Sequence, residues 1–251
     1  MAWVPGRWAD AAMRALGGLE ERHPSRTILL YPRPDADRDA LDASVDLRCF
    51  AVGGGAGVCF EVIELELNGP RAHAPASVVM PLLVPDLPAF LRWRGDLSFG
   101  EPELEGLVEV ADRLVVDSQE WDDPAAGLER LEPLFERIVV SDIAWARTEP
   151  WRFELAARWP GIAACEKLEV AGPEADARLL AGWLRARLKP DIELEHRPAE
   201  SLEAVAVDGE PVELSRPDER SPSDLLSEQL DIFSRDRVYE EAVCSYSSVP
   251  T

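Results

Sequence analysis

Four polar side chains stand where two predicted strands end, and they could line a binding crevice. Asp117 and Ser118 close the apolar strand expected over residues 113–117, and Ser141 and Asp142 follow the strand expected over residues 138–140. Ligands of open α/β sheets bind along the carboxyl edge of the strands, so these groups could hold a small molecule. Asp and Ser also cap the helix or turn that follows a strand, and this is the simpler interpretation.

The segment after Asp142 is rich in aromatic and cationic residues. Trp145, Arg147, Trp151 and Arg152 fall within eight residues, in the string D-x-x-W-x-R-x-x-P-W-R. No nucleophile stands there with a base, so the segment suits recognition better than catalysis. Trp and Arg are enriched among the anchor residues of protein interfaces. The alternative is a buried tryptophan whose neighbouring arginines pair with acids of the same segment.

Other candidate motifs are weak. His23 and Arg26 precede the first long strand, where they could bind an anion or could cap the preceding helix. The glycine-rich stretch 53–57 lacks both the GxGxxG spacing and the Walker lysine, so it is interpreted as a hairpin loop. The three histidines are scattered without the spacing of a zinc site, and there is no G-x-S-x-G elbow. The sequence therefore predicts no catalytic residue, no metal ligand and no cofactor.

The charge of the chain restricts its partners. It carries 48 acidic and 26 basic residues, a formal net charge of −22. A field of this sign repels nucleic-acid phosphates and anionic lipid. The longest apolar run, residues 77–91, is broken by three prolines and an aspartate, and the N-terminal residues lack a signal-peptide core. We therefore expect a cytoplasmic protein that binds neither nucleic acid nor membrane.

The four cysteines have no metal-binding spacing. They are Cys49, Cys59, Cys165 and Cys244. In a reducing compartment the expected state is a buried free thiol that stability does not require. The alternative is a redox pair, because Cys49 and Cys59 could face each other across a hairpin.

The pattern of elements predicts an α/β fold. Strands are expected near residues 27–31, 45–52, 58–67, 89–93, 113–117 and 138–140, and helices near residues 8–21, 72–84, 104–111, 124–136 and 150–159. This alternation indicates a mainly parallel sheet flanked by helices, with an antiparallel hairpin. After residue 160 an amphipathic helix over 174–188 and short alternating strands predict a smaller α+β region. The expected domains are therefore residues 1–160 and 161–251, which could pack as one unit.

Several segments, in order, resemble the glucose-6-phosphate dehydrogenase assembly protein family of the OpcA type. The matching segments are His23-Pro24-Ser25-Arg26, residues 77–88, the string from Asp142 to Arg152, residues 180–184, residues 224–230 and residues 238–242. The string is the most specific of them. Longer members of the family begin with an additional helix and strand, and here only one helix is expected before His23.

The resemblance implies a protein that is not an enzyme. Such a protein binds glucose-6-phosphate dehydrogenase and favours its active oligomer in the oxidative pentose phosphate pathway. His23, Arg26, Trp145, Arg147, Trp151 and Arg152 are then the candidate partner contacts. Two alternatives remain: an allosteric sensor that binds a sugar phosphate or nucleotide in the crevice, and an unrecognised enzyme of sugar-phosphate metabolism.

Overall fold

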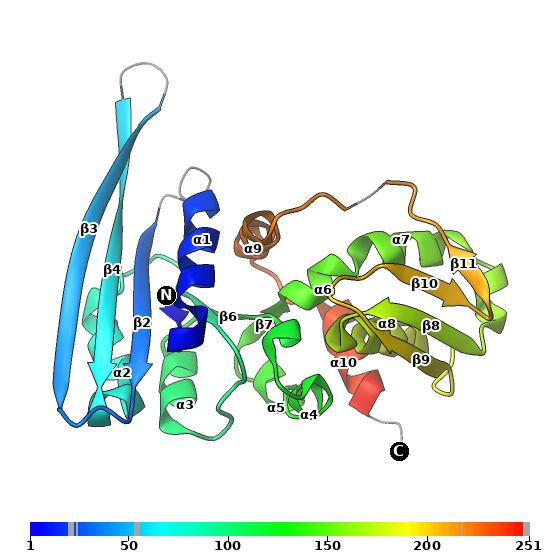
Figure 1. Cartoon of the computed structure of the whole chain (residues 1–251), viewed down its shortest axis with the longest axis horizontal. Coiled ribbons are helices and arrows are strands. Elements are labelled where there is room, and N and C mark those ends of the chain that lie inside the picture. Colours follow the sequence, from blue (N-terminus) through cyan, green and yellow to red (C-terminus); the bar gives the residue numbers. More distant parts are fainter. Residues whose placement is uncertain (20–22, 24, 53–55, 217, 248–251) are drawn as a thin grey trace. The chain divides into compact units, whose positions relative to one another are not determined.

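A computed structural model describes residues 1–19, 23, 25–52, 56–216 and 218–247 of the chain (Figure 1). These residues form two compact units. The first contains residues 1–116, 138–140 and 220–233, and the second contains residues 117–137, 141–219 and 234–251. The predicted α/β class is confirmed: a large, mostly parallel sheet lies in the first unit and a smaller sheet in the second.

The first unit is built on a seven-stranded sheet in the order β3-β4-β2-β1-β5-β6-β7. The strands are β1 (Ala2–Trp3), β2 (Arg26–Arg33), β3 (Ala40–Val52), β4 (Ala56–Asn68), β5 (Phe90–Trp93), β6 (Arg113–Val116) and β7 (Val139–Asp142). β1, β2, β4, β5 and β6 run parallel, while β3 and β4 form an antiparallel hairpin. The helices of this unit are the 3₁₀ turns η1 (Gly6–Trp8), η2 (Gly69–His73) and η3 (Met80–Leu82), with α1 (Ala9–Leu19), α2 (Pro75–Val79), α3 (Pro102–Glu109) and α9 (Pro222–Asp231).

β1 corrects one expectation from the sequence. The segment before His23 was expected to contain a single helix, yet Ala2–Trp3 pairs with both β2 and β5 and lies inside the sheet. Trp3 is buried and stacks on Trp93 with ring centroids 4.9 Å apart. Two residues are too few to display a period-2 pattern, which is why the sequence did not reveal this strand.

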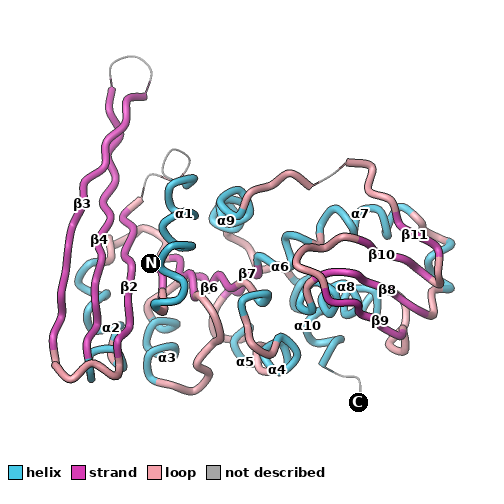
Figure 2. The backbone as a smooth tube through the Cα atoms, viewed as in Figure 1, coloured by secondary structure: helices cyan, strands magenta, loops and turns pink. Residues whose placement is uncertain are grey.

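The hairpin of β3 and β4 extends beyond the end of β2 (Figure 2). The expected glycine-rich connection lies in part, at residues 53–55, outside the described residues. Cys49 and Cys59 are directly opposite in the ladder and form a disulfide, and both are exposed. The expectation of buried free thiols is therefore wrong for this pair. Among the described cysteines, Cys165 is buried and free, and Cys244 is half-buried and free.

Reduction of the Cys49–Cys59 disulfide should destabilise the hairpin. In the chain-entropy account a cross-link over so short a loop contributes about 2–3 kcal/mol, because it restricts the unfolded chain. Thermal unfolding of the wild type and of a Cys49→Ser/Cys59→Ser variant, each with and without reductant, measures this contribution. Equal melting temperatures for all four samples would contradict it.

The second unit packs helices against a four-stranded sheet in the order β11-β10-β8-β9 (Figure 2). Its strands are β8 (Lys167–Gly172), β9 (Glu193–Pro198), β10 (Ala204–Val207) and β11 (Glu210–Val212). Its helices are η4 (Ser118–Glu120), α4 (Pro124–Glu129), α5 (Glu132–Phe135), α6 (Ile143–Arg147), α7 (Glu149–Ala157), η5 (Gly161–Ala164), α8 (Glu174–Arg187) and α10 (Arg237–Ser247). β8 and β9 are parallel and α8 connects them, while Asp208 and Gly209, both with positive φ, form the turn between β10 and β11.

The units differ from the expected domains 1–160 and 161–251. α6 and α7 belong to the second unit, because Trp151 and Leu155 pack into its core with Leu168, Leu180 and Val205. Two expected helices are also divided. Residues 124–136 form α4 and α5, and residues 72–84 form η2, α2 and η3, with a proline at N1 or N2 of each of these pieces.

Candidate functional site

Asp142 joins three elements of the second unit. Its Oδ1 accepts hydrogen bonds from the backbone amides of Ala144 (2.9 Å) and Ser118 (3.0 Å), and its Oδ2 accepts one from the Tyr239 hydroxyl (3.3 Å). The carboxylate therefore caps α6 and connects the start of that helix to η4 and to α10. Because Asp142 and Ser118 are fully buried, these oxygens hold protein groups rather than a ligand.

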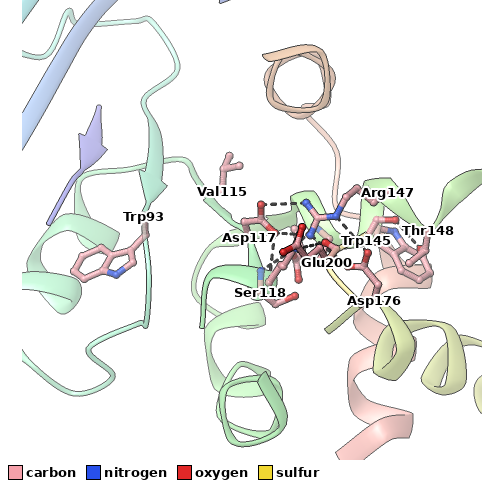
Figure 3. A network of polar contacts seen from close by, with 12 residues as sticks. Trp93, Val115, Asp117, Ser118, Trp145, Arg147, Thr148, Asp176 and Glu200 are labelled. Carbon is pink, nitrogen blue, oxygen red and sulfur yellow. Dashed lines mark hydrogen bonds and ion pairs between the residues drawn. The ribbon is translucent and has the colours of Figure 1, made fainter. Parts of the chain in front are cut away.

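Arg147 lies between two further aspartates (Figure 3). Its Nη1 and Nη2 donate to the two carboxylate oxygens of Asp117 at 3.1 and 2.8 Å, in a bidentate pair. Its Nε and Nη2 donate to the two oxygens of Asp176, both at 3.3 Å. The Asp176 side chain is 0% exposed, and that of Asp117 is 13% exposed. We call Asp117, Asp142, Arg147 and Asp176 the buried charge cluster.

The buried charge cluster contains three carboxyl groups and one guanidinium. Burial raises the pKa of Asp176 to about 7, the charges of Asp117 and Asp142 add to this, and Arg147 opposes it. Burial, and then the charge of Asp117, also raise the pKa of Asp142. Burial alone would lower the pKa of Arg147, but the two neighbouring carboxylates outweigh it and raise that pKa. The one guanidinium of the cluster therefore already binds two carboxyl groups, with a third nearby, and this arrangement is unfavourable for holding a phosphate there.

We expect Asp176 to give stability a specific pH dependence. A carboxyl whose pKa is higher in the folded than in the unfolded chain binds a proton on folding, so stability falls as pH rises from about 4 to about 7. Asp176→Asn removes this proton uptake. Relative to the wild type, the variant should gain a few kcal/mol of unfolding free energy between pH 4 and pH 8.

Denaturant unfolding at several pH values measures this difference. Asp191→Asn is the control, because Asp191 is exposed in the same unit and should show no such gain. A stability difference between Asp176→Asn and the wild type that stays constant with pH would exclude the proposed titration.

The tryptophans of the string point inward. Trp145 is buried, its indole Nε1 donates to Asp236 (2.8 Å), and its ring packs on Tyr239. Trp151 is buried in the core of the second unit. The guanidinium carbon of Arg152 lies 3.4 Å from the centroid of the Trp145 ring, a cation–π stack. Arg152 Nε also donates to the Thr148 hydroxyl (3.0 Å), so the string is held by contacts within its own unit.

Two other aromatic residues of this segment point outward. Phe153 on α7 is 69% exposed, and Trp159, just beyond the end of α7, is 65% exposed. Sequence reasoning did not single them out. For Phe153 the signal was its helical position, two residues from both Trp151 and Leu155, which places its side chain on the face of α7 opposite to these buried residues.

His23 and Arg26 belong to the first unit, where they line a cavity of about 480 Å³. His23 Nε2 is hydrogen-bonded to the Ser227 hydroxyl (2.7 Å), and Arg26 pairs with Glu61 (2.6 Å). Arg92 and Arg94 line the same cavity, and most of the remaining lining is apolar, from α1, β2, residues 82–90 and α9. His23 and Arg26 therefore lie at a cavity of the first unit, whereas the string belongs to the second unit.

The described part of the chain contains no group of three or more His, Cys, Asp or Glu side chains placed to hold a metal ion. Within the same residues, no helix has the length and apolar character needed to cross a membrane.

Two domain models of one known protein family match the chain. Residues 18–133 match the model described as the N-terminal domain of a glucose-6-phosphate dehydrogenase subunit. Residues 138–243 match the C-terminal domain of the same protein. The chain belongs to the OpcA family of glucose-6-phosphate dehydrogenase assembly proteins. The resemblance drawn from the sequence is therefore confirmed.

Curated relatives agree with this assignment. The chain is 26% identical over 180 residues to a protein of Nostoc punctiforme, and 24% identical over 182 residues to one of Synechococcus elongatus. A third, from Synechocystis, is 24% identical over 179 residues. All three carry the provisionally assigned name OxPP cycle protein OpcA. The matches cover 67%, 68% and 66% of this chain, but only 38%, 41% and 38% of those relatives.

The boundary between the two OpcA family domains falls near the start of β7. The string from Asp142 to Arg152 therefore opens the C-terminal OpcA domain. In this chain its residues cap α6, neutralise buried acids and fill the core of the second unit.

Proposed function

We propose that this chain is a non-catalytic accessory protein that binds glucose-6-phosphate dehydrogenase and favours its active oligomer. The proposal is supported by the match of both OpcA family domains, whose descriptions name a subunit of that enzyme. A protein that binds only the assembled enzyme stabilises that state by RT ln(1 + [L]/Kd), about 2.7 kcal/mol at a hundredfold excess over Kd. This mechanism requires a contact surface and no catalytic group.

Phe153 and Trp159 are our candidates for the centre of that surface. Large aromatic side chains dominate the binding energy of protein interfaces. These two are more than half exposed on the OpcA C-terminal domain, whereas Trp145 and Trp151 of the string are buried. We therefore propose that the string shapes α7 from inside, and that Phe153, Trp159 and the partly exposed Arg152 meet the enzyme.

The test is activation of the dehydrogenase from the same host. The purified enzyme is assayed with increasing amounts of this chain, and its oligomeric state is followed by light scattering. We expect higher activity and a larger assembled fraction in the presence of the chain. Unchanged activity and an unchanged oligomer distribution at saturating amounts would reject the proposal.

Alanine variants locate the contact. Phe153→Ala and Trp159→Ala should leave the melting temperature nearly unchanged, because exposed side chains contribute little to stability. Each should weaken binding by at least about tenfold, because truncating an interface hot-spot residue costs about 2 kcal/mol of binding free energy. Met80→Ala is the control, since Met80 is 59% exposed in the first unit and does not line its cavity. Full activation by both variants would mean that the contact with the dehydrogenase lies elsewhere on the chain. It would not reject the proposed accessory function.

The cavity of the first unit supports a second candidate function. Its size lies within the range of small-molecule sites, and its charged lining consists of Arg26, which pairs with Glu61, together with Arg92, Arg94 and Asp231. A small organic anion with an apolar part would fit this lining, and its binding could bias the dehydrogenase between states. Thermal-shift measurements with fatty acids, nucleotides and sugar phosphates test it, and no shift with any of them would reject this candidate.

A further inference from the structure

β3 is a long edge strand at one side of the first unit's sheet (Figure 1). It runs for 13 residues without proline, and its ladder with β4 is continuous from Ala40 to Val52. Within the described residues no strand pairs with its outer side. Natural edge strands are usually short, or are interrupted by proline or a bulge, because an open edge recruits another strand.

The register identifies the residues that face outward. In an antiparallel ladder, opposed residues alternate between hydrogen-bonded pairs, with Cα atoms about 5.5 Å apart, and closer pairs that are not hydrogen-bonded. Cys49 and Cys59 are opposed with Cα atoms 4.1 Å apart, so they form a pair of the second kind. The N–H and C=O groups of Cys49 therefore point away from β4. The same holds for every second residue before it: Leu47, Val45, Ala43 and Leu41.

The side chains of these residues form an apolar stripe. Val45 and Leu47 are 64% and 65% exposed, and Leu41 is 39% exposed. From Asp42 to Arg48 the side chains on the other face of the strand are polar: Asp42, Ser44, Asp46 and Arg48. A strand that pairs with this edge must therefore offer apolar side chains on one face and complementary charges on the other.

The β3 strand of a second copy of the chain offers both of these features. In an antiparallel pair of two copies centred on Val45, the outward-facing residues oppose one another: Val45 meets Val45, and Ala43 meets Leu47. On the other face Asp42 meets Arg48 at both ends of the pair. Asp42 binds Arg38 and Asn68 through Oδ2, which leaves Oδ1 to accept from the opposing Arg48.

We propose that two copies of this chain associate through their β3 edges, in an antiparallel pair centred on Val45. The two sheets then continue into one, and the exposed apolar stripes lie side by side. A second copy suits this edge because one register satisfies both its hydrogen-bonding positions and its charges. A net charge of −22 on each copy opposes association at low salt, so the pairing should be measured near physiological ionic strength, where the screening length is about 8 Å.

The first test is the mass of the chain from low to high micromolar concentration, by sedimentation or light scattering. We expect a reversible monomer–dimer equilibrium. Val45→Pro should raise the dissociation constant by at least about tenfold, because it removes both central N–H donors of the pair. The variant should remain folded, since proline is tolerated in an edge strand where its missing N–H faces outward.

The second test exchanges the charges. Asp42→Arg and Arg48→Asp each oppose like charges at both ends of the pair, so each should weaken the dimer. The double variant Asp42→Arg/Arg48→Asp should restore it, a result that general damage to the hairpin would not give. Circular dichroism and melting of every variant show whether the hairpin is intact.

Three results would overturn the proposal. One is a monomer at every concentration for the wild type. Another is a dimer that Val45→Pro leaves unchanged. The third is a dimer that survives denaturation without reductant and separates only when reductant is added, which would indicate an intermolecular disulfide instead of strand pairing. Recovery through an Asp46 exchange in place of Asp42 would also overturn the register centred on Val45.

Discussion

Replacement of Arg147 by alanine should lower the free energy of unfolding by roughly 3–5 kcal/mol, the usual cost of removing one partner from a buried ion pair. The variant leaves Asp117 and Asp176 without their guanidinium, and Asp142 lies close to both. The buried charge cluster would then contain three carboxyl groups and no cation. Denaturant unfolding followed by tryptophan fluorescence, sensitive to the Trp145 environment, measures the loss.

The control is an ion pair of the same unit that lies in water. Arg187 pairs with Glu241, and their side chains are 41% and 51% exposed, so Arg187→Ala should cost only about 0–1 kcal/mol. Neutralising the acids should rescue the fold. Arg147→Met combined with Asp117→Asn and Asp176→Asn should recover much of the lost stability, because no uncompensated charge stays buried. Similar losses for Arg147→Ala and Arg187→Ala would mean that the cluster is not the internal constraint described above.

A lysine variant of Arg147 distinguishes a role of this side chain within the fold from a role in binding the partner. The sequence offered both interpretations for this arginine, as a partner contact and as the partner of nearby acids. If Arg147 acts only within the fold, activation of the dehydrogenase per folded molecule should be unchanged in Arg147→Lys, which keeps the charge. If it contacts the enzyme, activation should fall although the variant stays folded.

Local signals predicted much of the fold. β2 and β4 were predicted from apolar runs between turn residues. The turn between β10 and β11 is encoded by the dipeptide Asp208-Gly209, whose residue types tolerate the positive φ found at both positions. The capping box of α9 is visible as Ser221 with Asp224 three residues later. These elements are encoded by neighbouring residues, so the sequence alone was sufficient for them.

The candidate site was harder to predict because its partners are distant in the sequence. Asp117, Asp142 and Asp176 lie far apart along the chain, and Arg147 binds two of them. Asp176 appears in the sequence as one more acid on an amphipathic helix, and nothing local shows that it is buried. The composition of the string allowed two interpretations, since tryptophan and arginine are common both at interfaces and in buried aromatic–cation stacks.

Gly182 stands at a contact between two helices of the second unit, α8 and α10. Gly182 lies in α8, and a Cβ atom there would overlap the carbonyl oxygen of Ala242 and lie 3.1 Å from its carbonyl carbon, in α10. It would also lie 3.2 Å from the Cβ atom of Tyr246. α8 and α10 therefore approach closely only because residue 182 has no side chain.

In an exposed helix, Gly→Ala would stabilise the protein by up to about 1 kcal/mol through helix propensity. At position 182 the clash is with backbone, which cannot rotate away, so Gly182→Ala should instead destabilise by about 1–3 kcal/mol or more. Gly161→Ala is the matched control, because a Cβ atom there has no neighbour within 4 Å, and it should be neutral. Thermal unfolding of the two variants compares them directly.

Because α10 carries Tyr239, which binds Asp142, a shift of α10 should also reach the buried charge cluster. Gly182→Ala should therefore perturb Trp145 fluorescence in the folded state, and an unchanged spectrum with unchanged stability would show that the two helices can separate without cost.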